Sequence, residues 1–193
     1  MALKQTRRLF LALWPDDNVR GQLLIHAHQW RWPSGCVRYA PADWHVTLHF
    51  LGDVAMDQVN AIETSAAVPF EPFELVLDQP ELWRHGLAVL GAAEVPMCLA
   101  ALYAQLGQAL RRLDLAVEAR PYRPHLTLAR HAADASPPSV SAPVRWQVLG
   151  FALVVSTGDV AQRYRVLRQY HARDSRPPKT PRCKLGTPLP PAV

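Results

Sequence analysis

Two tetrapeptides of the same form, His-x-Thr-Leu, occupy residues 45–48 and 125–128, one in each half of the chain. An apolar residue follows each His and each Thr, and this alternation predicts a half-buried β-strand. Successive side chains of a strand point to opposite faces, so His45 shares a face with Thr47, and His125 shares a face with Thr127. If the two strands face each other, two imidazoles and two hydroxyls converge on one small polar group.

The same alternation assigns the residues that follow each motif to a face. It places Phe50 on the buried face of the first strand, and it places Arg130 beside Leu128 on the buried face of the second. It places His49 on the same face as His45 but about 13 Å away, at the rim of any shared site.

The composition suits one globular domain with a sizeable core, because 49% of the 193 residues are hydrophobic. No apolar run approaches the length of a membrane span, and the N-terminus has no signal-peptide pattern. Three scattered cysteines, Cys36, Cys98 and Cys183, form no Cys-x-x-Cys pair. We therefore expect a reduced, cytoplasmic protein with no membrane segment, and we expect it to be a monomer.

The net charge of +5 is concentrated at the C-terminal end of the chain. Residues 173–193 carry five basic residues against Asp174 alone, whereas the other residues hold 16 basic and 15 acidic groups. This end is rich in proline and poor in large apolar residues, which is typical of a disordered extension. We predict one domain over residues 1–172 followed by a basic tail, and the charge of the domain itself does not indicate a nucleic-acid binder.

Periodicity and turn residues predict a mixture of strands and helices. Helices are predicted from Asp16 or Asp17 to residue 30, over residues 56–68, and from Pro96 to residue 113. Strands are predicted at residues 9–13, 37–39, 44–51, 73–77, 87–90, 125–128, 144–155 and 164–170. Gly52 is expected to close the first motif strand. Each half of the chain contains strand, helix and motif strand, so we predict an α+β fold of two sheet-and-helix lobes.

Three segments carry a family resemblance. Residues 8–13 are followed by Pro15-Asp16, residues 45–52 extend the first motif with Phe-Leu-Gly, and residues 120–130 flank the second with Arg-Pro-Tyr and Ala-Arg. Together they resemble the 2H phosphoesterase superfamily and, within it, the bacterial RNA 2′,3′-cyclic phosphodiesterases, first described as 2′-5′ RNA ligases. The resemblance covers residues 8–170. His49 departs from the pattern, because other members often carry Lys or a small residue there.

The resemblance implies a bilobal α+β fold, with two antiparallel sheets and flanking helices around a central cleft and a pseudo-two-fold relation between the lobes. It also implies an enzyme that hydrolyses RNA 2′,3′-cyclic phosphate ends, for example on tRNA fragments, to 2′-phosphomonoesters. A weak reverse 2′-5′ ligation would use the same transition state. No cofactor and no metal are expected.

The chemistry needs one base for the attacking water and one acid for the departing ribose oxygen, and two imidazoles can supply both near neutrality. We assign His125 as the base and His45 as the acid. Thr47 and Thr127 are suited to donate to the non-bridging phosphate oxygens, where negative charge accumulates. Spacing argues against a metal site, because His26 and His28 point to different sides of a predicted helix.

Further residues near the motifs are candidates for contacts with the substrate. Arg130 and Arg123 could meet phosphates, although Arg123 also suits a solvated turn. Phe50 and Tyr122 could stack on a base or pack in the core, and Tyr39 and Trp83 are weaker candidates of the same kind.

Two alternative functions remain at this stage. One is a cyclic phosphodiesterase acting on a small nucleotide, such as ADP-ribose cyclic phosphate or a 2′-5′ oligoadenylate. The other is a non-catalytic RNA-end binder.

Overall fold

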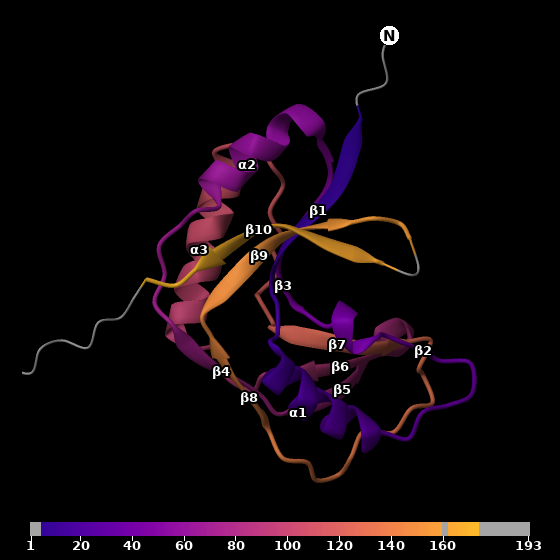
Figure 1. The fold of residues 1–193 in the computed structure, drawn as a ribbon. Coiled ribbons are helices and arrows are strands. Elements are labelled where there is room, and N and C mark those ends of the chain that lie inside the picture. The colour runs from indigo at the N-terminus through magenta and orange to yellow at the C-terminus, as the bar shows by residue number, and fades with distance from the viewer. Residues whose placement is uncertain (1–4, 160–161, 174–193) are drawn as a thin grey trace, which may run out of the picture.

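The computed structural model describes residues 5–159 and 162–173, which form an α+β fold (Figure 1). The helices are α1 Asp17–His28, α2 Val59–Ser65 and α3 Met97–Arg111, with short 3-10 helices at Pro41–Asp43, Met56–Gln58 and Arg84–Gly86. The strands are β1 Thr6–Leu13, β2 Val37–Arg38, β3 Val46–Ala55, β4 Phe73–Leu77, β5 Gln79–Trp83, β6 Leu87–Gly91, β7 His125–Arg130, β8 Val144–Val148, β9 Gly150–Ser156 and β10 Tyr164–His171. Apart from Arg173, the predicted basic tail lies outside the described residues.

The long sheet consists of two antiparallel halves that meet at a single residue pair. Its strand order is β10-β9-β1-β3-β7-β6-β5, and β2 pairs with the end of β7. The motif strands β3 and β7 are joined only through Val46 and Leu126, beyond which they diverge. Each half therefore contributes one motif strand to the junction, and this arrangement confirms the predicted bilobal α+β fold.

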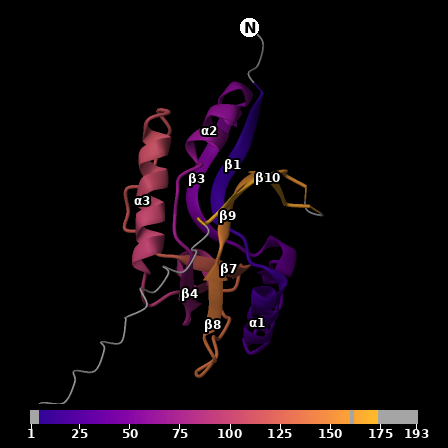
Figure 2. The same ribbon diagram turned by 60° about the vertical axis from the view of Figure 1, so that its left-hand side comes forward.

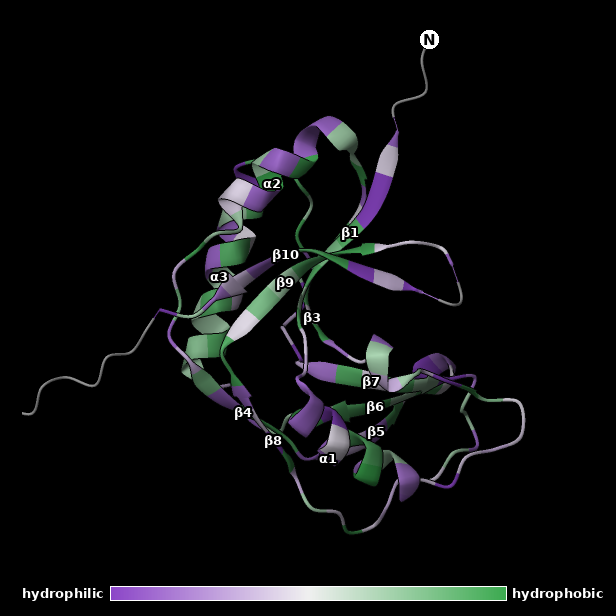
Figure 3. Ribbon diagram, viewed as in Figure 1, coloured by the Kyte–Doolittle hydropathy of each residue, from purple (hydrophilic) through white to green (hydrophobic). Residues whose placement is uncertain are grey.

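The helices cover the strands from different sides, and α1 and α3 lie on opposite sides of them (Figure 2). Asp16 caps α1 as predicted, because its carboxylate accepts from the N–H of Val19 at 2.9 Å. In α3 the predicted stripe Leu99, Leu102, Leu106 and Leu110 is buried against the sheet. Hydrophobic residues also gather where β1 and β9 cross the middle of the molecule (Figure 3). None of the described helices is long and apolar enough to cross a membrane.

One predicted strand, at residues 144–155, is two strands in two sheets. β8 pairs with β4 in a separate two-stranded sheet, whereas β9 pairs with β1 and β10 in the long one. The break falls at Leu149, whose side chain is 61% exposed. Periodicity could not show this break, because the residues on both sides of it are apolar.

A β-bulge follows the Thr of each motif and changes which residues face the site. In β3, Leu48 is the extra residue between the pairs Thr47–Ala12 and His49–Leu11. In β7, Leu128 is the extra residue between the pairs of Thr127 and Ala129 with β6. A bulge shifts the alternation of side chains by one residue, so the predicted faces beyond each motif are wrong.

Three predictions are corrected by these bulges. Phe50 is 58% exposed rather than buried, and it pairs with Phe10, whose ring contacts His45. Arg130, at the equivalent position of the second motif, is exposed rather than buried. His49 is buried, at 3% exposure, rather than at a rim. β3 also continues past Gly52 to Ala55, because a second register shift and the positive φ of Gly52 bend the strand without ending it.

Candidate active site

The junction of the two half-sheets brings the four motif side chains together. Val46 pairs with Leu126 in an antiparallel register, which places His45 across from Thr127 and Thr47 across from His125. All four side chains are half-buried, whereas Val46 and Leu126 are fully buried behind them. The structure therefore forms two such pairs, each with an imidazole from one half-sheet beside a hydroxyl from the other.

The backbone holds both imidazoles in the same way. The Nδ1 atom of His45 lies 2.7 Å from the carbonyl oxygen of Asp43, and that of His125 lies 2.8 Å from the carbonyl oxygen of Arg123. A carbonyl oxygen only accepts, so Nδ1 is the donor in both rings. Each Nε2 is therefore an acceptor in the neutral ring and a donor in the charged ring.

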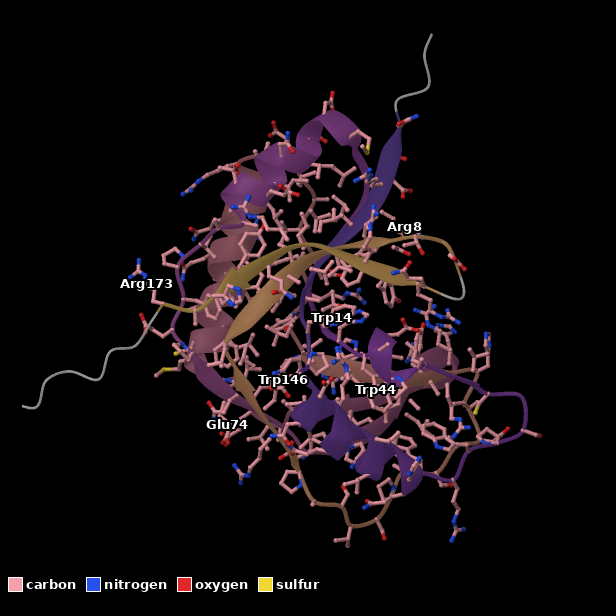
Figure 4. The ribbon with its side chains drawn as sticks, in the orientation of Figure 1. Arg8, Trp14, Trp44, Glu74, Trp146 and Arg173 are labelled. Carbon is pink, nitrogen blue, oxygen red and sulfur yellow. The ribbon has the colours of Figure 1, made fainter. Side chains whose placement is uncertain are left out.

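Aromatic rings enclose His45. Trp14 stacks on it with ring centroids 5.5 Å apart and planes within 6°, Phe10 lies 4.9 Å away, and Tyr164 presents its edge at 5.1 Å. Trp14 lies near the middle of the molecule (Figure 4). The pKa of His45 is lowered to about 4. Burial among these rings is the main cause and the charge of His125 adds to it, whereas the hydrogen bond to the Asp43 carbonyl raises the pKa.

His125 has a more open and more polar environment. Its ring contacts Trp83 at 4.3 Å. Burial is the main cause that lowers its pKa, and Arg123 adds to this effect, whereas its hydrogen bond to the Arg123 carbonyl and the carboxylate of Glu81 oppose it. Because both imidazole pKa values are lowered, both rings are neutral in the empty site at neutral pH.

A cavity of ≈ 950 Å³ opens where β3 diverges from the segment leading to β7. It borders Thr47 and His125, and its walls include Phe50, Trp83 and Tyr122. His45 does not line it. Solvent thus reaches His125 from this groove, whereas aromatic rings cover the half-buried His45.

Tyr122 supports the motif strand from the wall of this groove. Its hydroxyl donates to the carbonyl oxygen of Thr47 at 3.1 Å, and its ring stacks on Tyr103, with centroids 4.1 Å apart. Tyr103 in turn stacks on His49 at 4.1 Å, and the Tyr103 carbonyl oxygen lies 2.8 Å from Nε2 of that ring. His49 therefore belongs to the packing of α3 on β3, and Tyr122 holds Thr47 in place.

The other predicted contact residues lie on both sides of the junction. Arg123 is engaged within the protein, since it donates to both carboxylate oxygens of Glu81 at 2.9 and 3.1 Å and lies 4.9 Å from the centre of the Trp83 ring. Phe50 is exposed in the groove, and the guanidinium carbon of Arg8 lies 5.8 Å from the centre of its ring. Arg130 leans over the ring of Tyr39, 5.5 Å from its centre.

The sequence did not identify the rings that surround His45. Trp14 follows the first strand, and Tyr164 begins the last one, more than a hundred residues from the first motif. Neither residue belongs to a motif, and only the pairing of β1 with β3 and β9, and of β9 with β10, brings them to the site. Within the residues that the structure describes, no group of three or more His, Cys, Asp or Glu side chains is arranged to hold a metal ion.

Comparison with known proteins gives consistent matches. The model of the 2′-5′ RNA ligase superfamily matches residues 15–160. The RNA 2′,3′-cyclic phosphodiesterase of Escherichia coli strain K12 is 32% identical over 136 residues, which cover 69% of this chain and 77% of that protein. The crystal structure of E. coli LigT in its apo form has a TM-score of 0.75 at 27% identity, covering 87% of this chain and 98% of LigT. The LigT complex with 3′-AMP has a TM-score of 0.75 at 27% identity, covering 87% of this chain and 99% of that one.

Proposed function

The chain belongs to the 2′-5′ RNA ligase superfamily, and from this membership we propose that it hydrolyses RNA 2′,3′-cyclic phosphate ends to 2′-phosphomonoesters. The observation that carries the proposal is the matched pair of imidazoles at the junction, each anchored through Nδ1 by a backbone carbonyl oxygen. Cyclic ends on RNA, including tRNA fragments, are the proposed substrates. We also propose that the protein is a cytoplasmic monomer.

In the proposed reaction, water attacks the cyclic phosphorus while the bond from phosphorus to O3′ breaks. His125 takes the proton of the water through Nε2, and His45 delivers its Nε2 proton to O3′. Access supports this assignment, because His125 borders the open groove from which water enters, whereas His45 is enclosed by rings. His45 must be protonated first, and a bound phosphate favours that state because its negative charge raises the pKa of a neighbouring imidazole.

The two threonines would stabilise the charge that develops on the non-bridging oxygens. Each hydroxyl lies beside the imidazole of the other half-sheet, so both can donate to one phosphate held between the rings. A weak 2′-5′ ligation is also proposed, in which the 5′-hydroxyl of a second RNA attacks the cyclic phosphorus in place of water while the bond to O3′ breaks, and cleavage of that 2′-5′ diester is its reverse.

Two alternatives are less well supported. A non-catalytic RNA-end binder has no use for two imidazoles with free Nε2 atoms and lowered pKa values. A phosphodiesterase for a small nucleotide shares the chemistry and differs from the proposal in its substrate, for which the similarity to an RNA 2′,3′-cyclic phosphodiesterase favours RNA.

The proposal predicts turnover that does not depend on an added metal. An oligonucleotide with a 2′,3′-cyclic end should be converted to the 2′-phosphomonoester at the same rate with and without excess EDTA, as measured by gel mobility and by ³¹P NMR of the product. Activity that EDTA removes and zinc restores would contradict a two-histidine mechanism. A 3′-phosphate product would contradict the proposed cleavage of the bond to O3′.

The threonine hydroxyls should contribute less than the imidazoles. Thr47→Ala and Thr127→Ala should each lower kcat by roughly 10- to 10³-fold, because each removes one donor to the developing charge. Thr47→Ser and Thr127→Ser keep the hydroxyl and should recover most of the rate, which separates the donor role from loss of packing. Equal rates for the Ala and Ser variants would remove both hydroxyls from the mechanism.

A further inference from the structure

Three side chains, Glu81, Trp83 and Arg123, form a closed cluster on the His125 side of the active site. The carboxylate of Glu81, on β5, accepts a hydrogen bond from Nε1 of Trp83 and two from Nη2 of Arg123, at 2.9 and 3.1 Å. The guanidinium carbon of Arg123 lies 4.9 Å from the centre of the Trp83 ring. Each side chain thus contacts the other two, and Glu81 supplies the acceptor of every hydrogen bond among them.

The sheet places this cluster on the face that carries the motif side chains. Glu81 pairs with Val89 of β6, and Val89 pairs with Thr127 of β7. Residues that pair directly across antiparallel strands share a face, so Glu81 lies on the face of Thr127, two strands away. Trp83 shares that face, because it is two positions further along β5. Glu81 itself does not line the cavity of ≈ 950 Å³.

Both partners of Glu81 contact the imidazole of His125 directly. The ring of Trp83 lies 4.3 Å from that of His125, and the backbone carbonyl oxygen of Arg123 lies 2.8 Å from its Nδ1 atom. The first contact packs against the ring, and the second fixes its rotation and its tautomer. Glu81 is therefore connected to His125 through two separate side chains.

The strength of the ion pair does not account for this arrangement. The side chains of Arg123 and Glu81 are 64% and 36% exposed, and ion pairs exposed to this extent contribute little to stability. Their charges do reach the imidazole. Arg123 adds to the burial that lowers the pKa of His125, and the Glu81 carboxylate opposes it. His45 is the other titratable ring at the junction, and the charge of His125 lowers its pKa.

We propose that Glu81 is a positioning residue of the active site, which holds Trp83 against the His125 ring and holds Arg123 so that its carbonyl oxygen keeps the proton of that ring on Nδ1. The inference rests on the proposed function for the role of His125 as the base. Without the carboxylate, Nε1 of Trp83 and the guanidinium group of Arg123 lose their acceptor. Both contacts with His125 then loosen, and the positive charge of Arg123 is left beside the ring without its partner.

Glu81→Gln tests the role in turnover, because the amide keeps the shape of the side chain but has no charge and one acceptor oxygen fewer. We expect kcat to fall by about 10- to 100-fold, as for a base displaced from its reactive position. KM should change little, because Glu81 does not line the cavity. An unchanged kcat, or a loss that lies in KM alone, would overturn the proposal.

Glu74→Gln is the matched control. The Glu74 carboxylate also pairs with an arginine, Arg145, at 2.9 Å, and its side chain is 39% exposed, but it belongs to the separate sheet of β4 and β8. This variant should keep full activity. A loss equal to that of Glu81→Gln would show that any broken surface ion pair has the same effect, and the proposal would be wrong.

Arg123→Gln separates the electrostatic effect from loss of packing, since it keeps the backbone carbonyl. The carboxylate of Glu81 raises the pKa of His125 and the guanidinium group of Arg123 lowers it. In the pH profile of kcat/KM, the alkaline limb should therefore move to lower pH in Glu81→Gln and to higher pH in Arg123→Gln, while the acid limb of His45 stays in place. A cluster that only stabilises the fold would move neither limb, and that result, or shifts in one direction for both variants, would contradict the proposal.

NMR of the substrate-free protein keeps this test separate from the proposed function. Histidine ¹H–¹⁵N spectra report the tautomer of His125, whose signals are identified by their absence in His125→Ala. The neutral ring should carry its proton on Nδ1 in the wild-type protein, and Glu81→Gln should populate the form with the proton on Nε2. If the wild-type protein hydrolyses no cyclic end, the proposed function fails, yet this change of tautomer would still support the hold of Glu81 on His125. A ring that stays entirely in the Nδ1–H form in Glu81→Gln would overturn the proposal.

Discussion

Replacing either motif histidine by Ala should lower kcat by about 10²–10⁴-fold, the usual effect of losing one positioned acid or base. Both variants should fold, because each imidazole is half-buried and its Nδ1 bond goes to the backbone carbonyl two residues before it rather than into the core. Thermal unfolding and circular dichroism check this. His171→Ala, at an exposed position of β10, is the matched control and should keep full activity.

In the proposed mechanism the two histidines act on one event, so the effects of their removal on kcat should not add. The double variant His45→Ala/His125→Ala should be close in rate to the slower single variant, because groups that act as a unit are lost together. Effects that multiply would indicate that the rings act in separate steps or that one of them only binds the phosphate.

A substrate with a better leaving group distinguishes the acid from the base. In an analogue whose 3′ bridging oxygen is replaced by sulfur, the leaving thiolate needs no proton. This analogue should restore much of the rate of His45→Ala and leave His125→Ala slow, as measured by thiol release. Rescue of His125→Ala in place of His45→Ala would reverse the assignment of acid and base.

The sequence predicted the motif strands and the long helix because their signals are local. The apolar residues around His45 and His125 alternate over a strand length, and the leucines of α3 recur at helical spacing. These patterns depend only on burial of one face. The same is true of the Asp16 cap, whose carboxylate bonds an N–H three residues away.

The sequence could not predict the faces of Phe50 and Arg130, because a bulge depends on the partner strand. Leu48 and Leu128 are extra residues only relative to β1 and β6, and an apolar residue at either position looks like regular alternation. Both bulges lie directly after the motif Thr, so each bulge turns the fifth residue after the His toward the site. That residue is the exposed Phe50 on β3 and the exposed Arg130 on β7.

The sequence could not predict the side chains around the histidines either, because they come from strands that are distant along the chain. Trp14 and Tyr164 reach His45 only through the order β10-β9-β1-β3, and Glu81 reaches Arg123 through the β5–β6 hairpin. The motifs are nearly symmetric in sequence, yet one ring lies in an aromatic enclosure and the other beside a carboxylate. That asymmetry gives the two imidazoles different pKa values, which a pattern of residues cannot show.

The pH dependence of kcat/KM should therefore be bell-shaped, with its maximum on the acid side of neutrality. In the proposed mechanism the reactive form carries one proton in total, on His45, and is in equilibrium with the form in which His125 carries it. The pKa of His45 is lowered to about 4 and that of His125 is lowered from 6.5, so the free enzyme holds this single proton only between those values. Below about pH 4 both rings are charged, and above the pKa of His125 both rings are neutral. On each side kcat/KM should fall about tenfold per pH unit, so at pH 9 it should be more than about 10²-fold below its maximum.

Two tryptophan variants connect each limb of this profile to a ring. Trp14→Ala opens the enclosure of His45 and should move the lower limb upward, toward 6.5, because desolvation is the main cause of its lowered pKa. Trp83→Ala should instead move the upper limb, because that ring covers His125. The maximum of kcat should lie at higher pH than that of kcat/KM, since the bound phosphate raises the pKa of both imidazoles. A flat profile from pH 5 to 9, with chemistry shown to be rate-limiting by a solvent isotope effect, would exclude catalysis by a pair of imidazoles that must be oppositely protonated.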